Sequence, residues 1–262
     1  MESGSVVTSF DASGVATITL NRPPAHNAFD EAMIAGLTRA FRDIGSRDQV
    51  RLVILAGEGK NFCAGADLHW MRRAALFSEE ENLRDALAAA EMLRAAHQLP
   101  QPLIAKVQGL VLGGGVGLVA AADIAIAADD AEFGLSEVLL GLIPAVISPY
   151  VIRAIGARQA RRFFLTAERF PAAEARRLGL VHETAPAAKL AEKVDAISAA
   201  LLRGGPKALR AAKELIARVS SQPIDEATIR YTAERIAAVR AGDEAAEGIS
   251  AFLEKRPPHW RK

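Results

Sequence analysis

The sequence contains almost no cysteine and has no excess of either charge. Its 262 residues include one cysteine, Cys63, so the chain cannot form an internal disulfide. Lys and Arg together number 32 against 31 for Asp and Glu, which gives a formal net charge of +1, and the basic residues are scattered. Proteins that bind a nucleic-acid backbone carry clustered basic residues. We therefore expect no nucleic-acid partner.

The sequence also shows neither the pattern of a secretory signal nor that of a membrane span. The opening residues MESGSVVTSF lack a basic segment followed by an apolar one. The most apolar stretch, residues 109–128, holds five glycines and one charge, Asp123, which is costly at the middle of a bilayer. We interpret this stretch as a buried strand, a glycine-rich turn, a buried helix and a second strand. The prediction is a cytoplasmic protein without a membrane partner.

Strand and helix patterns alternate along the first two thirds of the chain. Half of the residues are apolar, enough for a large core. Apolar spacing predicts strands over 15–20, 51–56, 103–107 and 123–128, and helices beginning near Asp30 and over 79–97. This order is typical of an α/β fold with parallel strands buried on both faces.

Beyond about residue 186 the sequence shows only helical spacing. Apolar residues recur at three- and four-residue intervals up to about Leu253. A second apolar face on these helices would suit an oligomer interface, and packing on the chain's own domain would explain it equally well. The C-terminal region is therefore predicted to be helical.

Two short segments offer peptide N–H groups on small residues. They are FCAGAD, residues 62–67, and LGGGVG, residues 112–117. The second follows a predicted strand and opens a helix, but its glycine spacing differs from that of the dinucleotide fingerprint. A helix N-terminus suits a developing negative charge. Alternatively, the glycines only permit close helix packing.

One glutamate lies in surroundings that would change its acidity. Glu137 follows Gly134 and stands among leucines in FGLSEVLLGLIPA, where desolvation raises the pKa of a carboxyl group. Such a glutamate can exchange a proton near neutrality. Alternatively, it is an ordinary first-turn glutamate favoured by the helix dipole. Cys63 has no recognisable histidine partner, and the histidines lack metal-ligand spacing, so we predict neither a thiol nucleophile nor a metal site.

Four segments in order and spacing resemble one family. LNRPPAHNAF, FCAGADLHWM, KVQGLVLGGGVGLVAAADIAIA and FGLSEVLLGLIPA are together similar to the crotonase superfamily of enoyl-CoA hydratases and isomerases, and the likeness spans residues 15–255. It implies an α/β superhelix of ββα units over 1–195 and a helical C-terminal trimerisation region over 196–262. Trimers of this type usually pair into hexamers. No cofactor is implied beyond coenzyme A as part of the substrate.

The resemblance also implies a thioester site. The thioester oxygen would accept hydrogen bonds from the backbone N–H groups of Ala66 and Gly114, each worth about 3 kcal/mol as an enolate forms. The residues implied to bind the substrate or coenzyme A are Pro24, Ala25, Ala64, Asp67, Leu68, His69, Phe252 and Lys255.

Some of these residues have an alternative interpretation that does not involve the substrate. In the family, the position of His69 is often occupied by Lys. His69 either contacts coenzyme A or is a solvated loop residue. Phe252 and Lys255 match residues that reach the coenzyme A of a neighbouring subunit, or are helix core and a solvated helix end. Trp70 and Met71 are expected to line an apolar pocket or to pack beneath it.

The sequence departs from the family at one catalytic position. Hydratases of this family hold the attacking water with two glutamates, whereas here Gly117 takes the first position and Glu137 the second. The segments GLIPAVISPYVIRAIG and FFLTAERF resemble bacterial methylglutaconyl-CoA and carboxygeranoyl-CoA hydratases, which also appear with glycine there. Our leading hypothesis is hydration or dehydration of a branched, carboxylate-bearing enoyl-CoA in leucine or acyclic-terpene breakdown.

Two alternatives stay open. A double-bond isomerase could use Glu137 as its only proton shuttle. A protein that binds acyl-CoA or RNA without turnover belongs to another class. One family relative binds RNA through a lysine-rich helix, but the matching helix here, about residues 30–46, contains no Lys.

Overall fold

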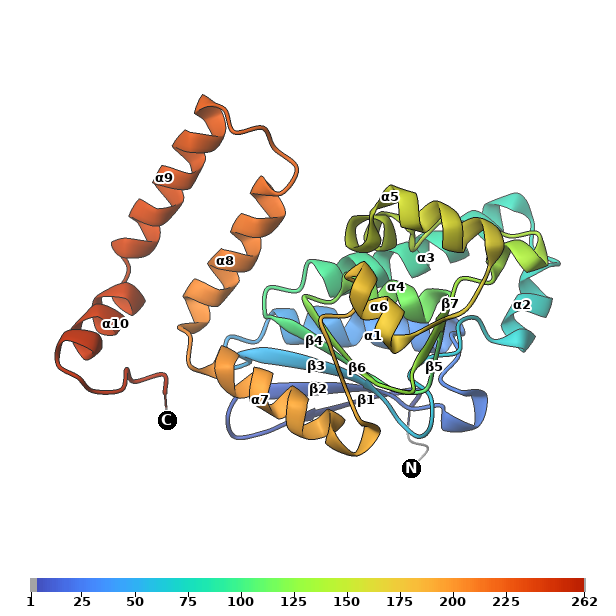
Figure 1. The fold of residues 1–262 in the computed structure, drawn as a ribbon, viewed down its shortest axis with the longest axis horizontal. Helices are drawn as coiled ribbons and strands as arrows, with labels where there is room; N and C mark the ends of the chain where they lie inside the picture. The colour runs from blue at the N-terminus through green and yellow to red at the C-terminus, as the bar shows by residue number, and fades with distance from the viewer. Residues whose placement is uncertain (1–3, 262) are drawn as a thin grey trace.

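The chain is organised around a six-stranded sheet in the order β1-β2-β3-β4-β6-β9 (Figure 1). A computed structural model describes residues 4–261. The strands are β1 (Val6–Phe10), β2 (Val15–Leu20), β3 (Leu52–Gly57), β4 (Leu103–Val107), β6 (Ile124–Ala128) and β9 (Glu183–Ala185). Only β1 and β2 pair antiparallel, and all other neighbours are parallel.

A second sheet has three short strands. They are β5 (Leu110–Leu112), β7 (Glu132–Gly134) and β8 (Phe170–Pro171). The middle strand β7 pairs parallel with β5 and antiparallel with β8. This sheet matters for the site, because β5 leads directly into the glycine-rich segment.

Helices cover the large sheet on both faces (Figure 1). One layer holds α1 (Glu31–Gly45), α3 (Glu79–His97), α4 (Gly114–Ala121), α5 (Ser148–Thr166) and α6 (Ala172–Leu178). The helix α7 (Leu190–Leu202) covers the other face. Alternate residues of β4 point to opposite sides, since Leu103, Ala105 and Val107 join the larger apolar cluster and Ile104 the smaller one beside α7. The expected parallel sheet, buried on both faces, is thus confirmed.

Short helices complete the layer near the site. They are α2 (Leu68–Ala74) and three 3₁₀ turns, η1 (Pro23–Ala25), η2 (Glu137–Leu140) and η3 (Ala187–Lys189). Residues 109–128 form β5, α4 and β6, as expected from their glycines. Within residues 4–261, no helix is both long and apolar enough to cross a membrane.

Three C-terminal helices leave the body of the molecule (Figure 1). They are α8 (Pro206–Val219), α9 (Glu226–Arg240) and α10 (Asp243–Leu253), and the first two run side by side in opposite directions. The division predicted at residues 195 and 196 stays a prediction; that position lies inside α7, and the departing helices begin at Pro206.

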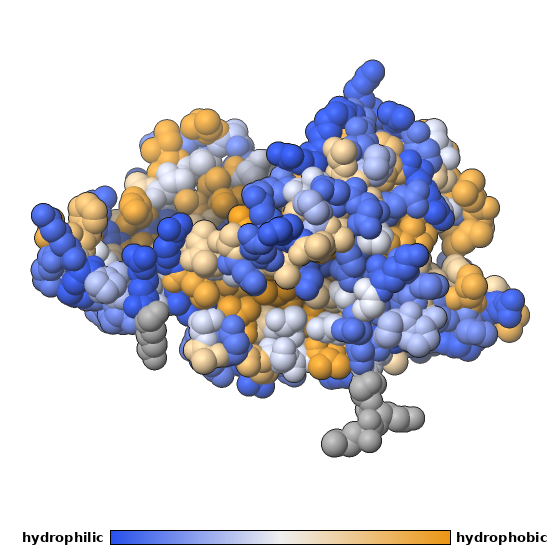
Figure 2. All heavy atoms as spheres, turned by 60° about the horizontal axis from the view of Figure 1, so that its bottom comes forward, coloured by the Kyte–Doolittle hydropathy of each residue, from blue (hydrophilic) through white to orange (hydrophobic). Residues whose placement is uncertain are grey.

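The departing helices, called here the C-terminal lobe (residues 206–261), bury little of their apolar surface. No described residue of α8 or α9 is buried, and large apolar side chains are exposed on all three helices: Ile216, Ile229, Ile236, Ile249, Phe252 and Leu253. Figure 2 shows hydrophobic residues gathered at the surface where this lobe meets the body. Exposed apolar area of this kind marks an interaction surface.

Arg51 ties the C-terminal lobe to the sheet. Its guanidinium donates hydrogen bonds to the carbonyl oxygens of Leu202 at 2.7 Å, Gly204 at 3.0 Å and Trp260 at 2.9 Å. Two of these carbonyls lie at the junction between α7 and α8, and the third lies near the end of the chain. One side chain before β3 therefore fixes both ends of the lobe.

We expect Arg51→Met to loosen the lobe without unfolding the core. Charge-assisted hydrogen bonds contribute about 1.5 to 3 kcal/mol, so local opening should rise roughly tenfold or more. Cleavage within residues 206–261 by chymotrypsin, followed by mass spectrometry, measures this opening. Arg203→Met, which changes an exposed arginine at the same junction, is the control. Equal cleavage rates for wild type and Arg51→Met would contradict the anchoring role.

Candidate active site

The two segments rich in free N–H groups run side by side as parallel chains. Cys63 donates its N–H to Leu110 O at 3.2 Å, and Leu112 donates to Cys63 O at 2.9 Å. Because the pairing is parallel, both chains continue in the same direction beyond it. Ala66 and Gly114 follow on the same side, although they are nearly fifty positions apart in the sequence.

Both predicted donors have unpaired N–H groups. The neighbours of Ala66 are bonded to Phe29 on either side, since Phe29 N–H donates to Gly65 O at 2.7 Å and Asp67 N–H donates to Phe29 O at 2.8 Å. Within residues 4–261, the N–H of Ala66 has no hydrogen-bond partner. Gly114 is the first residue of α4, where an N–H lacks an intrahelical acceptor. Two fixed donors are therefore left for a ligand oxygen.

The backbone around Gly114 requires small residues. A Cβ added at Gly114 would lie 2.5 Å from a ring carbon of Phe29. Gly113, just before it, has φ 47° and ψ −114°, a conformation that side chains disfavour. Glycine at these positions lets the chain approach Phe29 and turn into α4.

A partly buried ion-pair network holds the loop of Ala66. Arg22 contacts Asp67 and Asp30 at 3.0 Å each, and Asp67 accepts the N–H groups of His69 and Trp70 at the start of α2. Burial acts to raise the pKa of Asp67, but these hydrogen bonds and Arg22 hold it below its usual range. The predicted role of Asp67 is substrate binding, whereas its carboxylate is engaged within the protein.

Glu137 lies beside the donor of Gly114. A Cβ built on Gly113 would be 2.9 Å from the Glu137 Oε1 atom, so the carboxyl group faces the residue next to Gly114. Glu137 Oε2 is buried and has no hydrogen-bond partner among the described residues. Burial raises the pKa of Glu137. The sequence-based prediction for its acidity is thus confirmed in direction, and one oxygen of the carboxyl group, Oε2, is left without a partner in the described part of the chain.

Hydrocarbon fills the position expected for a second glutamate. A Cβ added at Gly117 would lie 2.9 Å from Ile147 Cβ, closer still to its Cγ2 atom, and 3.5 Å from Leu93. Both side chains are buried. A carboxylate has no room at Gly117 in this packing.

A cavity of about 830 Å³ opens beside Ala66. Its wall comes from α2, from the first turns of α3 and from the segment after Glu137. The lining residues are Ala66, Leu68, Trp70, Met71, Arg72, Ala74, Ala75, Asn82, Asp85, Leu140 and Leu142. Trp70 and Met71 line a pocket, as the sequence predicted, and Leu68, predicted to bind the substrate or coenzyme A, lies in the same wall. The cavity is large enough for an acyl chain.

The other predicted binding residues fall into two groups. Pro24 and Ala25 form η1 next to the loop of Ala64, whose N–H donates to His26 O at 3.0 Å. This contact brings the turn next to the loop of Ala66, and the exposed His69 follows Ala66 by three residues. Phe252 and Lys255 instead belong to the C-terminal lobe, which is at the opposite end of the molecule from α2 (Figure 1). A single chain does not bring these two residues to Ala66.

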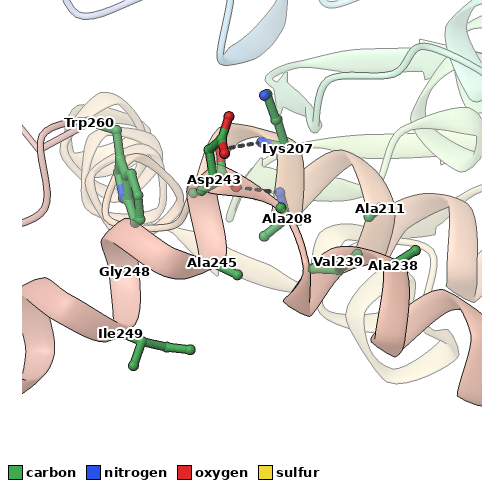
Figure 3. A pocket seen from close by; sticks show the side chains of 13 residues that line it. Lys207, Ala208, Ala211, Ala238, Val239, Asp243, Ala245, Gly248, Ile249 and Trp260 are labelled. Carbon is green, nitrogen blue, oxygen red and sulfur yellow. Dashed lines mark hydrogen bonds between the residues drawn. The ribbon is translucent and has the colours of Figure 1, made fainter.

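Two other features carry no catalytic chemistry. Burial raises the pKa of the Cys63 thiol to about 12, so it is a poor nucleophile. A cavity of about 520 Å³ between α8, α9 and α10 is lined mainly by small and apolar residues (Figure 3). Its carboxylate Glu244 accepts the N–H groups of Lys207 and Ala208, drawn as dashed lines, and caps α8.

Two unpaired donors, a half-buried carboxyl group and a nearby cavity form an arrangement suited to stabilising an oxyanion and moving a proton. Comparisons with known proteins identify the family. Residues 11–262 match the family model described as enoyl-CoA hydratase/isomerase. The crystal structure of an enoyl-CoA hydratase from Shewanella pealeana has a TM-score of 0.94 and 43% identity, covering 98% of this chain and 96% of that one.

Curated relatives are similar over nearly their whole length. A putative enoyl-CoA hydratase of Thermus thermophilus is 35% identical, covering 94% of this chain and 97% of that protein. The 2,3-dehydroadipyl-CoA hydratase of Escherichia coli is 32% identical, covering 94% and 95%. The chain belongs to the enoyl-CoA hydratase/isomerase family, the crotonase superfamily, and is an enzyme of this class.

Three residues that shape the site were not among the predicted ones. Arg22 and Phe29 lie inside the segment LNRPPAHNAF, and Ile147 lies inside GLIPAVISPYVIRAIG, so the signal was present in segments already noticed. What each residue touches depends on tertiary packing. Their roles could be read only from the structure.

We expect Gly117→Glu to lower the free energy of unfolding. The double variant that combines Gly117→Glu with Ile147→Gly should recover much of this lost stability. Overpacking a buried site costs about 1 to 3 kcal/mol, and removing Ile147 opens space for the carboxylate. Chemical denaturation of both variants and of Ile147→Gly alone measures the coupling. A Gly117→Glu variant as stable as wild type would show that the site is open.

Proposed function

We propose that this enzyme hydrates, or in reverse dehydrates, a branched enoyl-CoA whose acyl chain bears a carboxylate, such as methylglutaconyl-CoA, in leucine or acyclic-terpene breakdown. The single observation that carries the proposal is the half-buried carboxyl group of Glu137, which lies against Gly113, next to Gly114, and has one buried oxygen, Oε2, without a partner among the described residues. Coenzyme A is part of the substrate, and the mechanism needs no further cofactor.

In this mechanism Glu137 carries out both proton transfers. Its carboxylate takes a proton from water as the water oxygen bonds to the β-carbon, and the double-bond electrons pass through the α-carbon to the thioester oxygen. The N–H groups of Ala66 and Gly114 stabilise that enolate oxygen. Protonated Glu137 then delivers its proton to the α-carbon, which completes a syn addition and restores the carboxylate.

Three observations support a one-carboxylate hydration of such a substrate. Ile147 and Leu93 occupy the space of a second glutamate, so Glu137 acts without one. Arg72 lies in the wall of the cavity beside Ala66 and provides a cation for a substrate carboxylate. The relative from Escherichia coli is named for 2,3-dehydroadipyl-CoA, a dicarboxylic acyl group.

Double-bond migration is the second candidate, and the same lone carboxyl favours it. Glu137 would remove a proton from one carbon and return it to another, without water. Purified protein is therefore offered methylglutaconyl-CoA, crotonyl-CoA and an enoyl-CoA with its double bond one carbon further from the thioester. Water addition to the first substrate supports the proposal, whereas migration alone overturns it.

We expect Glu137→Gln to lower kcat by about 10²- to 10⁴-fold with a small change in KM. The pKa of Glu137 is raised, so ionising it in the folded protein is unfavourable and this cost grows as pH rises through its folded pKa. The stability of the variant relative to wild type should therefore increase from acidic to neutral pH. Turnover and denaturant midpoints at several pH values measure both effects. Unchanged turnover in the variant would exclude Glu137.

The proposal includes a homotrimer or a dimer of trimers. It accounts for the exposed apolar faces of the C-terminal lobe and for the distance of Phe252 and Lys255 from Ala66 in one chain, because a neighbouring copy would supply them. Native mass spectrometry should give three or six chains, and a monomer would contradict the proposal. The cytoplasmic location predicted from the sequence remains part of the same proposal.

A further inference from the structure

One face of α3 carries a carboxylate where apolar residues are expected. Met92, Leu93 and Ala96 are buried on this face, and Ala89 packs against the same cluster. Asp85 lies one turn before Ala89 on the same face and is half-buried. A buried or half-buried polar residue within an apolar stripe is informative because it has a desolvation cost.

Only one of the two carboxyl oxygens of Asp85 accepts a hydrogen bond from a described residue. Oδ1 accepts a hydrogen bond from Trp70 Nε1 at 3.2 Å, and within residues 4–261 Oδ2 has no hydrogen bond and no cation within ion-pair distance. Burial raises the pKa of Asp85; the bond from Trp70 opposes this, and the charge of Glu31 adds to it. A hydrogen bond from Trp70 alone would need only one carboxyl oxygen of Asp85.

Trp70 and Asp85 both line the 830 Å³ cavity that begins at Ala66. Ala66 carries the predicted donor for the thioester oxygen, so an acyl chain extending from that oxygen into the cavity passes α2 and α3. Leu68, Met71, Leu140 and Leu142 provide apolar walls. Asp85 is the one acidic side chain among the described lining residues. It therefore places a polar group in the wall of the pocket that we assign to the acyl chain.

We propose that Asp85, positioned by Trp70, binds an oxygen group on the acyl chain of the substrate and so determines specificity. This inference rests on the proposed function and names the feature that its substrate must carry. A terminal hydroxyl donates to the carboxylate of Asp85. A terminal carboxylate accepts from its protonated form, and Arg72 in the same wall balances the charge.

Binding of saturated acyl-CoA thioesters tests this without needing turnover. Pentanoyl-CoA, glutaryl-CoA and a pentanoyl-CoA with a terminal hydroxyl have equal chain length and differ only at the end. Titration calorimetry should show that wild type binds at least one oxygen-bearing ligand roughly tenfold or more tighter than pentanoyl-CoA. Which of the two is preferred distinguishes the hydroxyl from the carboxylate.

Two variants and a control locate the effect at Asp85. Asp85→Leu should abolish the preference while keeping affinity for pentanoyl-CoA, and Asp85→Asn should retain the preference for a hydroxyl. Glu80→Leu, an exposed acidic residue on the same helix, should behave as wild type. Thermal unfolding checks that the variants fold.

The outcomes separate this inference from the proposed function. An unchanged preference in Asp85→Leu, or no preference in wild type, overturns the role of Asp85 even if methylglutaconyl-CoA is hydrated. A preference that Asp85→Leu removes supports the role even if wild type catalyses only double-bond migration, which would overturn the hydratase proposal alone.

Discussion

The site depends on one parallel backbone contact between the loop at Cys63 and β5. This contact sets two segments nearly fifty residues apart in register, and each then leaves one N–H unpaired, at Ala66 and at Gly114. Unpaired buried N–H groups are costly, so the surrounding structure must hold them in place. Phe29 does this by bonding on both sides of Ala66 and packing against Gly114, and Arg22 fixes the next residue, Asp67.

Close packing decides how many carboxylates the site contains. Protein interiors leave few gaps, so a change at one position requires a matching change at its neighbour. At Gly117 that neighbour is Ile147, and the two positions together replace a charged side chain with hydrocarbon. Burial also raises the pKa of the one glutamate that remains, Glu137.

Local patterns predicted much of the fold. Strands β2 and β4 and the helix α3 have the predicted limits, because their periodicity and their end signals, such as the prolines after α3, are local. The short strands β1, β7, β8 and β9 were not individually predicted. Some have only two or three residues, and they exist because distant segments supply their hydrogen bonds.

The sequence by itself determined the family and the two loops that carry Ala66 and Gly114. Glycine and alanine at those positions are the only residues that allow a close approach to the backbone. It also showed that a glutamate was missing at Gly117. Only the tertiary structure decided that Ile147 fills that space, that Asp67 is engaged by Arg22, and that Asp85 lines the cavity beside Ala66. Each of these depends on contacts between residues 15 to 45 positions apart, which local sequence patterns do not encode.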